Sequence, residues 1–527
     1  MTDYLKIGKA TELSGWNYRL YRFFEMIPAL SSVGTLVILV VLSYFKPVWV
    51  AYFLIAFDVY WLLQVIYMAM YMVSSYNKVK RNSKINWEEK CQNLTNTDTS
   101  LPADCLAKQG WRSQDLYQLV ILPTYNEDIE IIRSAINSIL NDSFPTSQMI
   151  IAVAMEERAG ESAYIKAKAI SEEFSDKFGH FVISFHPDGI AGEIKGKGAN
   201  QAWCGKKVKE EIIDPEHIPY DKILVSVFDI DTIIRPGYFF ALSYKFLTSS
   251  SPYRASYQPV PIYHNNLWSA PFFSRVVSAS NTFWQMMMQI RQEKLVTYSS
   301  HSMTWQALVD IGFWSPKMVS EDSRIFFHCL LHYKGDYRVE PLYIMVSMDV
   351  TTDTSFSKTA LSLYKQQRRW AWGAENVAYL MFNYLKKNKE LGPQKKKIFN
   401  QILIQIYGFH SWATSALIIA VIGWLPMLLG GDRFNSTVLS GNLPAISSTL
   451  MNMAMIGMVL SAIISNLLLP KRPAKYSAWK SVSMVVEWLF VPVSIIIFGA
   501  IPCLDSQIRL ALGKYMGFWV TPKERHE

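Results

Sequence analysis

Five long apolar runs constrain the fold of this chain more than any other feature of its sequence. Each run is close to the roughly 20 residues that cross a lipid bilayer as a helix. The runs are Ala29–Phe45, Trp49–Val73, Ile402–Leu429, Leu450–Leu469 and Val482–Ile501. The first run lacks an Ala-x-Ala cleavage site, which is typical of an anchor rather than of a removable signal peptide. The sequence therefore predicts an integral membrane protein.

Basic residues beside the spans predict the side of the membrane on which the middle of the chain lies. Lysines and arginines cluster in residues 78–84, 386–397 and 471–480. By the positive-inside rule these stretches are cytoplasmic, and so is the large segment between the second and third spans. The formal net charge of +9 then reflects topology. It forms no separate patch of the kind that binds nucleic acid, so no nucleic-acid partner is expected.

The C-terminal end carries two conflicting topology signals. Five spans that start from a cytoplasmic N-terminus would place the C-terminus outside, whereas Lys514, Lys523 and Arg525 favour the cytoplasmic side. The last apolar run also contains Glu487 and Pro492 and is followed directly by Pro502, three residues that a span avoids. One of the last segments is therefore re-entrant, interfacial or a broken hairpin, and these three interpretations stay open.

Strand and helix patterns alternate between the second and third spans. The expected strands are Leu119–Tyr125, Met149–Met155 and Phe181–Phe185, and the helices between them are Glu130–Leu140 and Glu161–Phe174. This alternation predicts a mostly parallel sheet with helices on both faces. Two later helices are expected at Ser323–His332 and Ser362–Tyr384.

A further apolar run begins at Leu224 and ends in two carboxylates one residue apart, Asp229 and Asp231. A short run rich in β-branched residues predicts a strand that is buried on both faces. The C-terminal ends of such strands are where an open α/β sheet binds ligands. Two carboxylates at this spacing can hold one divalent cation together with the phosphates that it bridges. Asp229 and Asp231 are therefore predicted ligands of Mg²⁺ or Mn²⁺, and an ordinary solvated turn is the alternative.

Three more motifs occur in a recognisable order around this pair. Residues 121–127 read Ile-Leu-Pro-Thr-Tyr-Asn-Glu, residues 320–322 read Ser-Glu-Asp, and residues 366–370 read Gln-Gln-Arg-Arg-Trp. Together with Asp229-Ile230-Asp231 they resemble the signatures of membrane-embedded family 2 glycosyltransferases, the group that contains cellulose, chitin and hyaluronan synthases. The resemblance covers roughly residues 119–370 and the flanking spans. It implies a Rossmann-like α/β GT-A domain on the cytosolic side of a plasma or inner membrane.

The resemblance also implies a reaction. A sugar, a hexose or an N-acetylhexosamine, would pass from a nucleotide, most commonly UDP, to a growing β-linked polysaccharide, with inversion at the sugar carbon. The Gln-x-x-Arg-Trp motif goes with processive members of the family, which also translocate the product. Two alternatives stay open: non-processive transfer to a lipid acceptor, and a transferase-like scaffold or transport subunit without activity. The expected partners are the donor, a glycan or lipid acceptor, and membrane lipids.

Each motif residue has a role that the resemblance implies. Asp322 would be the base that takes the proton of the acceptor hydroxyl, whereas capping of the following helix is the structural alternative. The expected donor contacts are Thr124, Tyr125, Glu127, Glu156, Lys197, Asp229, Asp231, Gln366, Arg369 and Trp370. The expected acceptor contacts are Glu321, Tyr263 and Trp370.

Two details refine these assignments. Gln366, Arg369 and Trp370 lie at i, i+3 and i+4 and so share one helical face, from which Arg368 points away. Family members commonly carry an aspartate at the end of the second strand to recognise uracil, whereas this chain has Glu156 and Glu157 there. The identity of the base therefore stays open.

The expected organisation has seven parts. They are an amphipathic lead (1–28), two spans (29–73), a linker (74–118), the GT-A domain (119–358), interfacial helices (359–400), about three transmembrane or re-entrant segments (401–505) and a tail (506–527).

Overall fold

The computed structural model of the protein describes residues 4–522. Within them, an α/β domain is built on a seven-stranded sheet with the order β3-β2-β1-β4-β6-β5-β7. The parallel part consists of β1 (Tyr117–Pro123), β2 (Met149–Glu156), β3 (His180–His186) and β4 (Ile223–Val227). Beyond it, β6 (Ser302–Thr304) is antiparallel to β4 and β5, while β5 (Ala255–Tyr263) is parallel to β7 (Arg338–Met348). This mostly parallel sheet confirms the predicted fold class.

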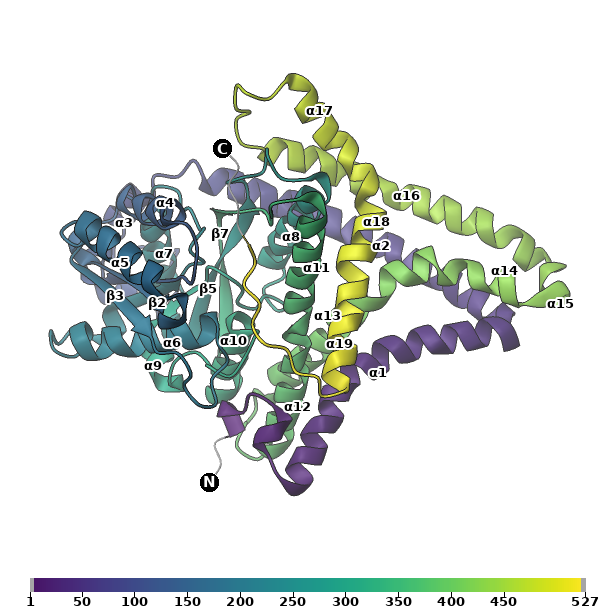
Figure 1. Ribbon diagram of the computed structural model, residues 1–527, viewed down its shortest axis with the longest axis horizontal. Helices are drawn as coiled ribbons and strands as arrows, with labels where there is room; N and C mark the ends of the chain where they lie inside the picture. Colours follow the sequence, from purple (N-terminus) through teal and green to yellow (C-terminus); the bar gives the residue numbers. More distant parts are fainter. Residues whose placement is uncertain (1–3, 523–527) are drawn as a thin grey trace.

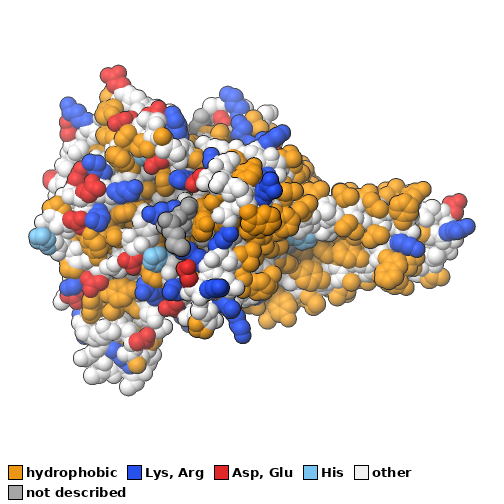
Figure 2. Space-filling model, turned by 90° about the horizontal axis from the view of Figure 1, so that it is seen from below, with side chains coloured by type: hydrophobic (Ala, Val, Ile, Leu, Met, Phe, Trp, Pro, Cys, Tyr) orange, Lys and Arg blue, Asp and Glu red, His pale blue; other side chains and the backbone are white. Residues whose placement is uncertain are grey.

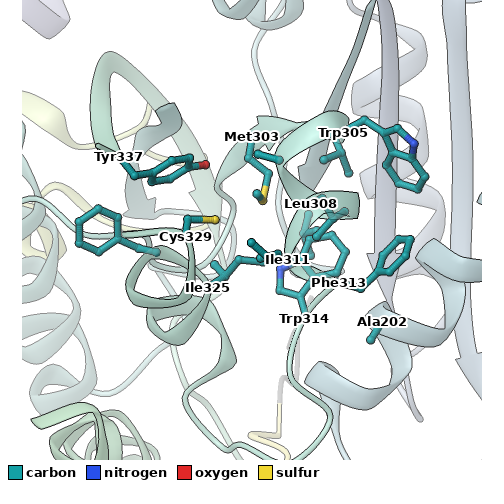
Figure 3. Packing of buried hydrophobic residues seen from close by; sticks show 14 of the residues in the cluster. Ala202, Met303, Trp305, Leu308, Ile311, Phe313, Trp314, Ile325, Cys329 and Tyr337 are labelled. Carbon is teal, nitrogen blue, oxygen red and sulfur yellow. The ribbon is translucent and has the colours of Figure 1, made fainter. Parts of the chain in front are cut away.

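Two hydrophobic cores cover the two faces of the sheet, because successive strand residues point to opposite sides. Leu119 and Ile121 of β1 belong to one core, and Val120 and Leu122 belong to the other. The first core packs against α6 (Lys197–Val208), α9 (Trp305–Ile311) and α10 (Glu321–His332). The second packs against α4 (Ile129–Leu140), α5 (Glu161–Phe174) and α7 (Tyr238–Thr248). Figure 3 shows side chains of the first core, with Trp305, Phe313 and Ile325 among them.

The structure differs from the sequence predictions in the helices that carry the last two motifs. Helix α10 begins at Glu321 with Ser320 as its N-cap residue, so both acids of the motif lie in its first turn. The predicted long helix at 362–384 is two helices, α11 (Phe356–Ala371) and α12 (Glu375–Lys386). They are separated by a 3₁₀ turn at Gly373, where an added Cβ would lie 3.2 Å from the Phe409 ring.

The predicted linker at 74–118 is an ordered part of the domain. Helix α2 (Pro47–Asn82) extends into it, and α3 (Trp87–Gln92) packs on α7. Buried side chains of this segment, including Cys91 and Leu106, belong to the second core. The polar composition of the segment therefore conceals a few apolar residues that are sufficient to dock it.

Five helices among the described residues are long and apolar enough to cross a membrane. They are α1 (Gly15–Phe45), α2, α13 (Lys395–Ala420), α16 (Val438–Leu468) and the continuous run 478–511, which contains α17 (Ala478–Val486), α18 (Val491–Ile495) and α19 (Ile501–Ala511). Figure 1 shows α1, α2 and α16 extending away from the sheet toward a common tip beside α14 (Leu425–Leu429) and α15 (Gly431–Asn435). Hydrophobic side chains cover this stem in Figure 2, and charged ones gather over the α/β domain and at the tip.

The second half of the predicted lead (residues 1–28) and the first predicted span form one continuous helix. Helix α1 starts at Gly15 and contains Pro28, and Figure 1 shows that it bends. Its first part packs on α12, where the Tyr21 ring lies 5.2 Å from that of Phe382. The first turns of α1 thus belong to the α/β side, and the remainder extends into the stem.

The last apolar run crosses the direction of the other stem helices in Figure 1, with α19 beside α11. Asp505 of α19 accepts a hydrogen bond from Arg368 of α11 at 2.9 Å. The chain then returns to the α/β side, where Tyr515 donates to Glu25 at 2.8 Å. Near the other terminus, Lys317 binds Glu12 at 2.8 Å. Both ends of the described chain therefore lie on the side of the α/β domain.

Candidate active site

A buried lysine joins two of the predicted acids at the carboxyl edge of the sheet. Lys197 Nζ lies 2.7 Å from Asp229 Oδ1 and 2.9 Å from Asp322 Oδ1. Burial alone would lower the pKa of Lys197, but the two carboxylates raise it above its usual value, so the ammonium stays charged. The start of α6, the loop after β4 and the first turn of α10 thus meet at one ion cluster.

The two acids after β4 have different surroundings. Asp229 faces the cluster, and its second oxygen accepts a hydrogen bond from Ser299 Oγ at 2.6 Å. Asp231 is only 1 % exposed, and its carboxylate accepts the backbone N–H of Asp349 at 2.9 Å, just after β7. Asp229 is therefore the more exposed member of the pair, with 25 % of its side chain accessible.

The carboxylates after β4 fit a divalent cation that takes its remaining ligands from the substrate and water. No three His, Cys, Asp or Glu side chains form a metal-binding group within residues 4–522. Mg²⁺ is commonly held by one or two carboxylates and takes its other ligands from phosphates and water. Asp229 and Asp231 match that donor set.

The two acids of the Ser-Glu-Asp motif also differ. Glu321 is 2 % exposed, and burial, followed by the charge of Asp322, raises its pKa to about 8. Gly198 permits this packing, since an added Cβ would lie 3.1 Å from Glu321 Cβ. The side chain of Glu321 therefore packs between α6 and α10, and its expected acceptor contact stays a prediction. Asp322, with 24 % of its side chain exposed, is the acid that a substrate can reach.

Arg369 connects the Gln-x-x-Arg-Trp helix with the ion cluster. Gln366 accepts a hydrogen bond from Thr351 Oγ1 at 2.8 Å. Arg369 interacts electrostatically with Glu321 and Tyr263, whereas its neighbour Arg368 is paired with Asp505 of α19. Trp370 is half-buried on α11.

Tyr263 at the end of β5 closes another wall of the site. Burial, followed by the charges of Asp229 and Asp231, raises its pKa, so the phenol is neutral and can donate a hydrogen bond. The contact of Tyr263 with an acceptor stays a prediction.

The loop after β1 is shaped by its own acid. Glu127 accepts hydrogen bonds from Thr124 Oγ1 at 2.8 Å and from the backbone N–H of Tyr125 at 2.7 Å. Thr124 and Glu127 thus hold the loop, and Tyr125 presents its half-buried ring. Glu156 ends β2 on the neighbouring strand and is 4 % exposed.

Sequence reasoning missed two features of the site. His301 is buried, with Nδ1 2.8 Å from the carbonyl oxygen of Tyr298, and it interacts electrostatically with Asp322 and Lys197. Burial lowers its pKa and keeps the ring neutral. No local pattern marks such a histidine, because its partners come from distant strands and helices.

The second missed feature is the chain after α19. The Phe518 ring occupies the space in which a Cβ on Gly196 would stand, and it lies 4.7 Å from the Arg369 guanidinium. Trp519 lies 5.3 Å from the Lys365 ammonium. The aromatic content of residues 515–519 was the only available signal, and nothing in the sequence relates it to a segment more than 300 residues earlier.

Comparisons with known proteins bear on this geometry. A mannosyltransferase, PcManGT from Pyrobaculum calidifontis in complex with GDP-Man and Mn²⁺, is 14 % identical, with 77 % of this chain and 99 % of that chain covered and a TM-score of 0.40. S. aureus TarS residues 1–349 in complex with UDP-GlcNAc is 12 % identical, with 68 % and 93 % covered and a TM-score of 0.31. No curated protein sequence matches this chain.

The sequence profile of a family described as glycosyl transferase family group 2 matches residues 224–490, which is about half of the chain. The match begins in β4, includes Asp229, Asp322 and the Gln-x-x-Arg-Trp helix, and ends within the last apolar run. With a mostly parallel α/β domain, acids at the edge of its sheet and an apolar stem, the chain belongs to glycosyl transferase family group 2.

Proposed function

We propose that this protein is a membrane-bound inverting glycosyltransferase that takes a hexose or N-acetylhexosamine from a nucleoside diphosphate. The observation that carries the proposal is the convergence of Asp229 and Asp322 on Lys197, beside the Gln-x-x-Arg-Trp helix. Direct displacement at the sugar carbon needs a base on the face opposite the leaving group. Asp322 is the base in this proposal, because it is partly exposed and is separated from Asp229 by one ammonium group.

The diphosphate leaving group would bind on the Asp229 side of the cluster. Asp229 and Asp231 would hold Mg²⁺ or Mn²⁺ with the diphosphate, and the cation would neutralise the charge that develops on departure. Lys197 and Arg369 supply fixed positive charge to the phosphate oxygens. When Lys197 turns to the phosphate, Asp322 exchanges this ion pair for a hydrogen bond from the acceptor hydroxyl.

The acceptor in this proposal is the end of a growing β-linked glycan. Tyr263 and Trp370 offer an aromatic wall with a hydrogen-bond donor, which suits a sugar ring. The family match through the apolar stem supports a product that crosses the membrane, with the α/β domain on the cytosolic side of a plasma or inner membrane.

A lipid acceptor is the second candidate, and a cavity favours it. A cavity of about 50 Å³ lies between α8 (Phe272–Ile290), the end of α16 and the last apolar run. Its walls are mainly apolar, but Tyr263 also borders it. The cavity would hold the first few carbons of an acyl or prenyl chain whose polar end lies at Tyr263.

Sugar transfer by the full-length protein in detergent tests the proposal. Radiolabelled UDP-glucose, UDP-N-acetylglucosamine, UDP-galactose and GDP-mannose are each incubated with Mg²⁺ or Mn²⁺, and the products are sized. A long product that a β-glycan hydrolase degrades supports the polymer synthase, and a lipid-extractable product of one length supports the second candidate. Absence of transfer from every donor, with added lipid and oligosaccharide acceptors, would contradict both and favour an inactive subunit.

A further inference from the structure

An arginine pairs with the buried acid at the end of β2. Arg158 Nε and Nη2 both donate to the Glu156 carboxylate, the second bond being 3.0 Å long. The same guanidinium lies over the Tyr125 ring, 4.1 Å from its centroid. The planar guanidinium of Arg158 thus binds both carboxylate oxygens of Glu156 and covers one face of the Tyr125 ring.

The position of this stack fits the base end of a nucleotide. Strand β1 lies between β2 and β4, so Tyr125 after β1 stands between Glu156 on β2 and Asp229 after β4. Two strand spacings, roughly 10 Å, therefore separate Glu156 from the diphosphate end of the site. A ribose spans part of that distance when the base lies on Tyr125 and the diphosphate at Asp229.

We propose that the donor carries guanine, and that the Arg158 guanidinium is a stand-in for the base. This inference rests on the proposed function. A guanidinium forked onto a carboxylate presents two parallel N–H donors in one plane, and guanine presents the same pair from N1–H and the 2-amino group. Guanine can therefore replace Arg158 on both oxygens of Glu156 and on the Tyr125 ring without leaving the buried carboxylate unpaired.

The other common bases lack this pair of donors. Uracil has one N–H between two carbonyl oxygens, one of which would face the second oxygen of Glu156. Adenine and cytosine each place an acceptor nitrogen beside their amino group, which a carboxylate repels. Only guanine offers two adjacent donors. A site in which both carboxylate oxygens of Glu156 need a hydrogen bond therefore selects guanine.

The surroundings allow Arg158 to move aside. A cavity of about 80 Å³ adjoins the stack and is lined in part by His186, Asp188, Glu193 and Lys195. Asp188 interacts electrostatically with Arg158 and provides a charge partner when the guanidinium leaves Glu156. Arg158 and Lys195, both cations of this lining, can then donate to guanine O6.

Calorimetric titration of the full-length protein in detergent with GDP, IDP and UDP, each with Mn²⁺, tests the inference. IDP keeps N1–H but lacks the 2-amino group, so it makes one bond to Glu156 instead of two. We expect GDP to bind about tenfold more tightly than IDP, and UDP to bind more weakly than either. This comparison uses only the natural chain and does not depend on the folding of a variant.

The variant Glu156→Gln sharpens the test, with Glu157→Gln as its matched control. A carboxamide offers one acceptor, so Glu156→Gln should reduce the GDP preference over IDP to less than about threefold. The exposed neighbour Glu157 should leave the preference unchanged when it is replaced. An unchanged preference in a folded Glu156→Gln protein would overturn the assignment of Glu156.

The nucleotides also separate this inference from the proposed function. Tightest binding of UDP would overturn the guanine inference and leave the glycosyltransferase proposal standing. Failure of all three nucleotides to bind in the presence of Mn²⁺ would overturn both.

Discussion

The two ends of the donor site each pair an acid with an internal cation, but they are built differently. At the diphosphate end Lys197 bridges Asp229 and Asp322, which come from two further elements. At the base end Arg158 binds Glu156, two residues away in the same turn. The first cluster holds three elements together, whereas the second can open by the rotation of one side chain.

Neighbouring contacts strengthen this difference. Asn200 of α6 donates to the carbonyl oxygens of Ala154 at 2.7 Å and Thr124 at 3.3 Å, which fixes the start of α6 against the ends of β1 and β2. The 3₁₀ turn Glu157–Ala159 that carries Arg158 is followed by Gly160 at φ +71°. We infer that the diphosphate end is preorganised and that the base end adapts. Changes at the first should alter turnover, and changes at the second should alter the choice of nucleotide.

Replacement of the proposed base gives the largest expected effect. Asp322→Asn should lower turnover by about 10³-fold, because general base catalysis contributes roughly 10²–10⁴-fold. Nucleotide affinity should stay within about threefold, since Asp229, Lys197 and the base end remain. Initial rates and calorimetry measure the two quantities. The control is Asp310→Asn on the protein surface, and a comparable rate for both variants would refute the base assignment.

Removal of the metal should lower sugar transfer through its effect at the diphosphate end of the site. Chelation with EDTA is expected to lower sugar transfer by on the order of a hundredfold or more, because a cation contributes several kcal/mol of charge stabilisation. Added Mn²⁺ or Mg²⁺ should restore transfer, and Asp229→Asn should raise the cation concentration that is required. Full activity after exhaustive chelation would show that Lys197 and Arg369 suffice for the diphosphate.

Substitution of two adjacent arginines tests which face of α11 contributes to turnover. Arg369→Ala should lower turnover by about tenfold to a hundredfold, because it removes a charge-assisted contact to phosphate. Arg368→Ala removes the ion pair with Asp505, a contact of about 0–1 kcal/mol where it is partly exposed, and a cation–π contact with Tyr364. Steady-state rates for the pair distinguish the two positions. Equal losses would mean that α11 acts as a structural unit rather than through one face.

The smallest effect concerns stability and pH at Glu321. Its pKa is about 8 in the folded protein and near 4.5 when exposed, so the folded state binds an extra proton between these values. Stability should therefore be greatest below pH 4.5 and fall as pH rises toward 8. Glu321→Gln removes this term and should raise the unfolding temperature by a few degrees at pH 8.5 but not at pH 5. Parallel pH profiles for both proteins would contradict the enclosed, protonated carboxyl.

The sequence alone determined the class of the protein. Helix α5 has the predicted bounds, and the strand, helix and span patterns identify the other main elements, because burial on one or both faces leaves a local periodicity. The order of the acids and of the Gln-x-x-Arg-Trp motif along the chain identified the family. The side-chain spacing on α11 separated Arg369 from Arg368, since helical geometry is local.

The tertiary structure decided which charges meet. The bridge from Lys197 to Asp322 joins residues 125 positions apart, and the chain after α19 places Phe518 against Arg369 and Gly196. The different environments of Glu321 and Asp322, which are neighbours in sequence, arise from the packing of α6 on α10. Such pairings depend on burial and on contacts between distant segments, and neither leaves a periodic pattern in a single sequence.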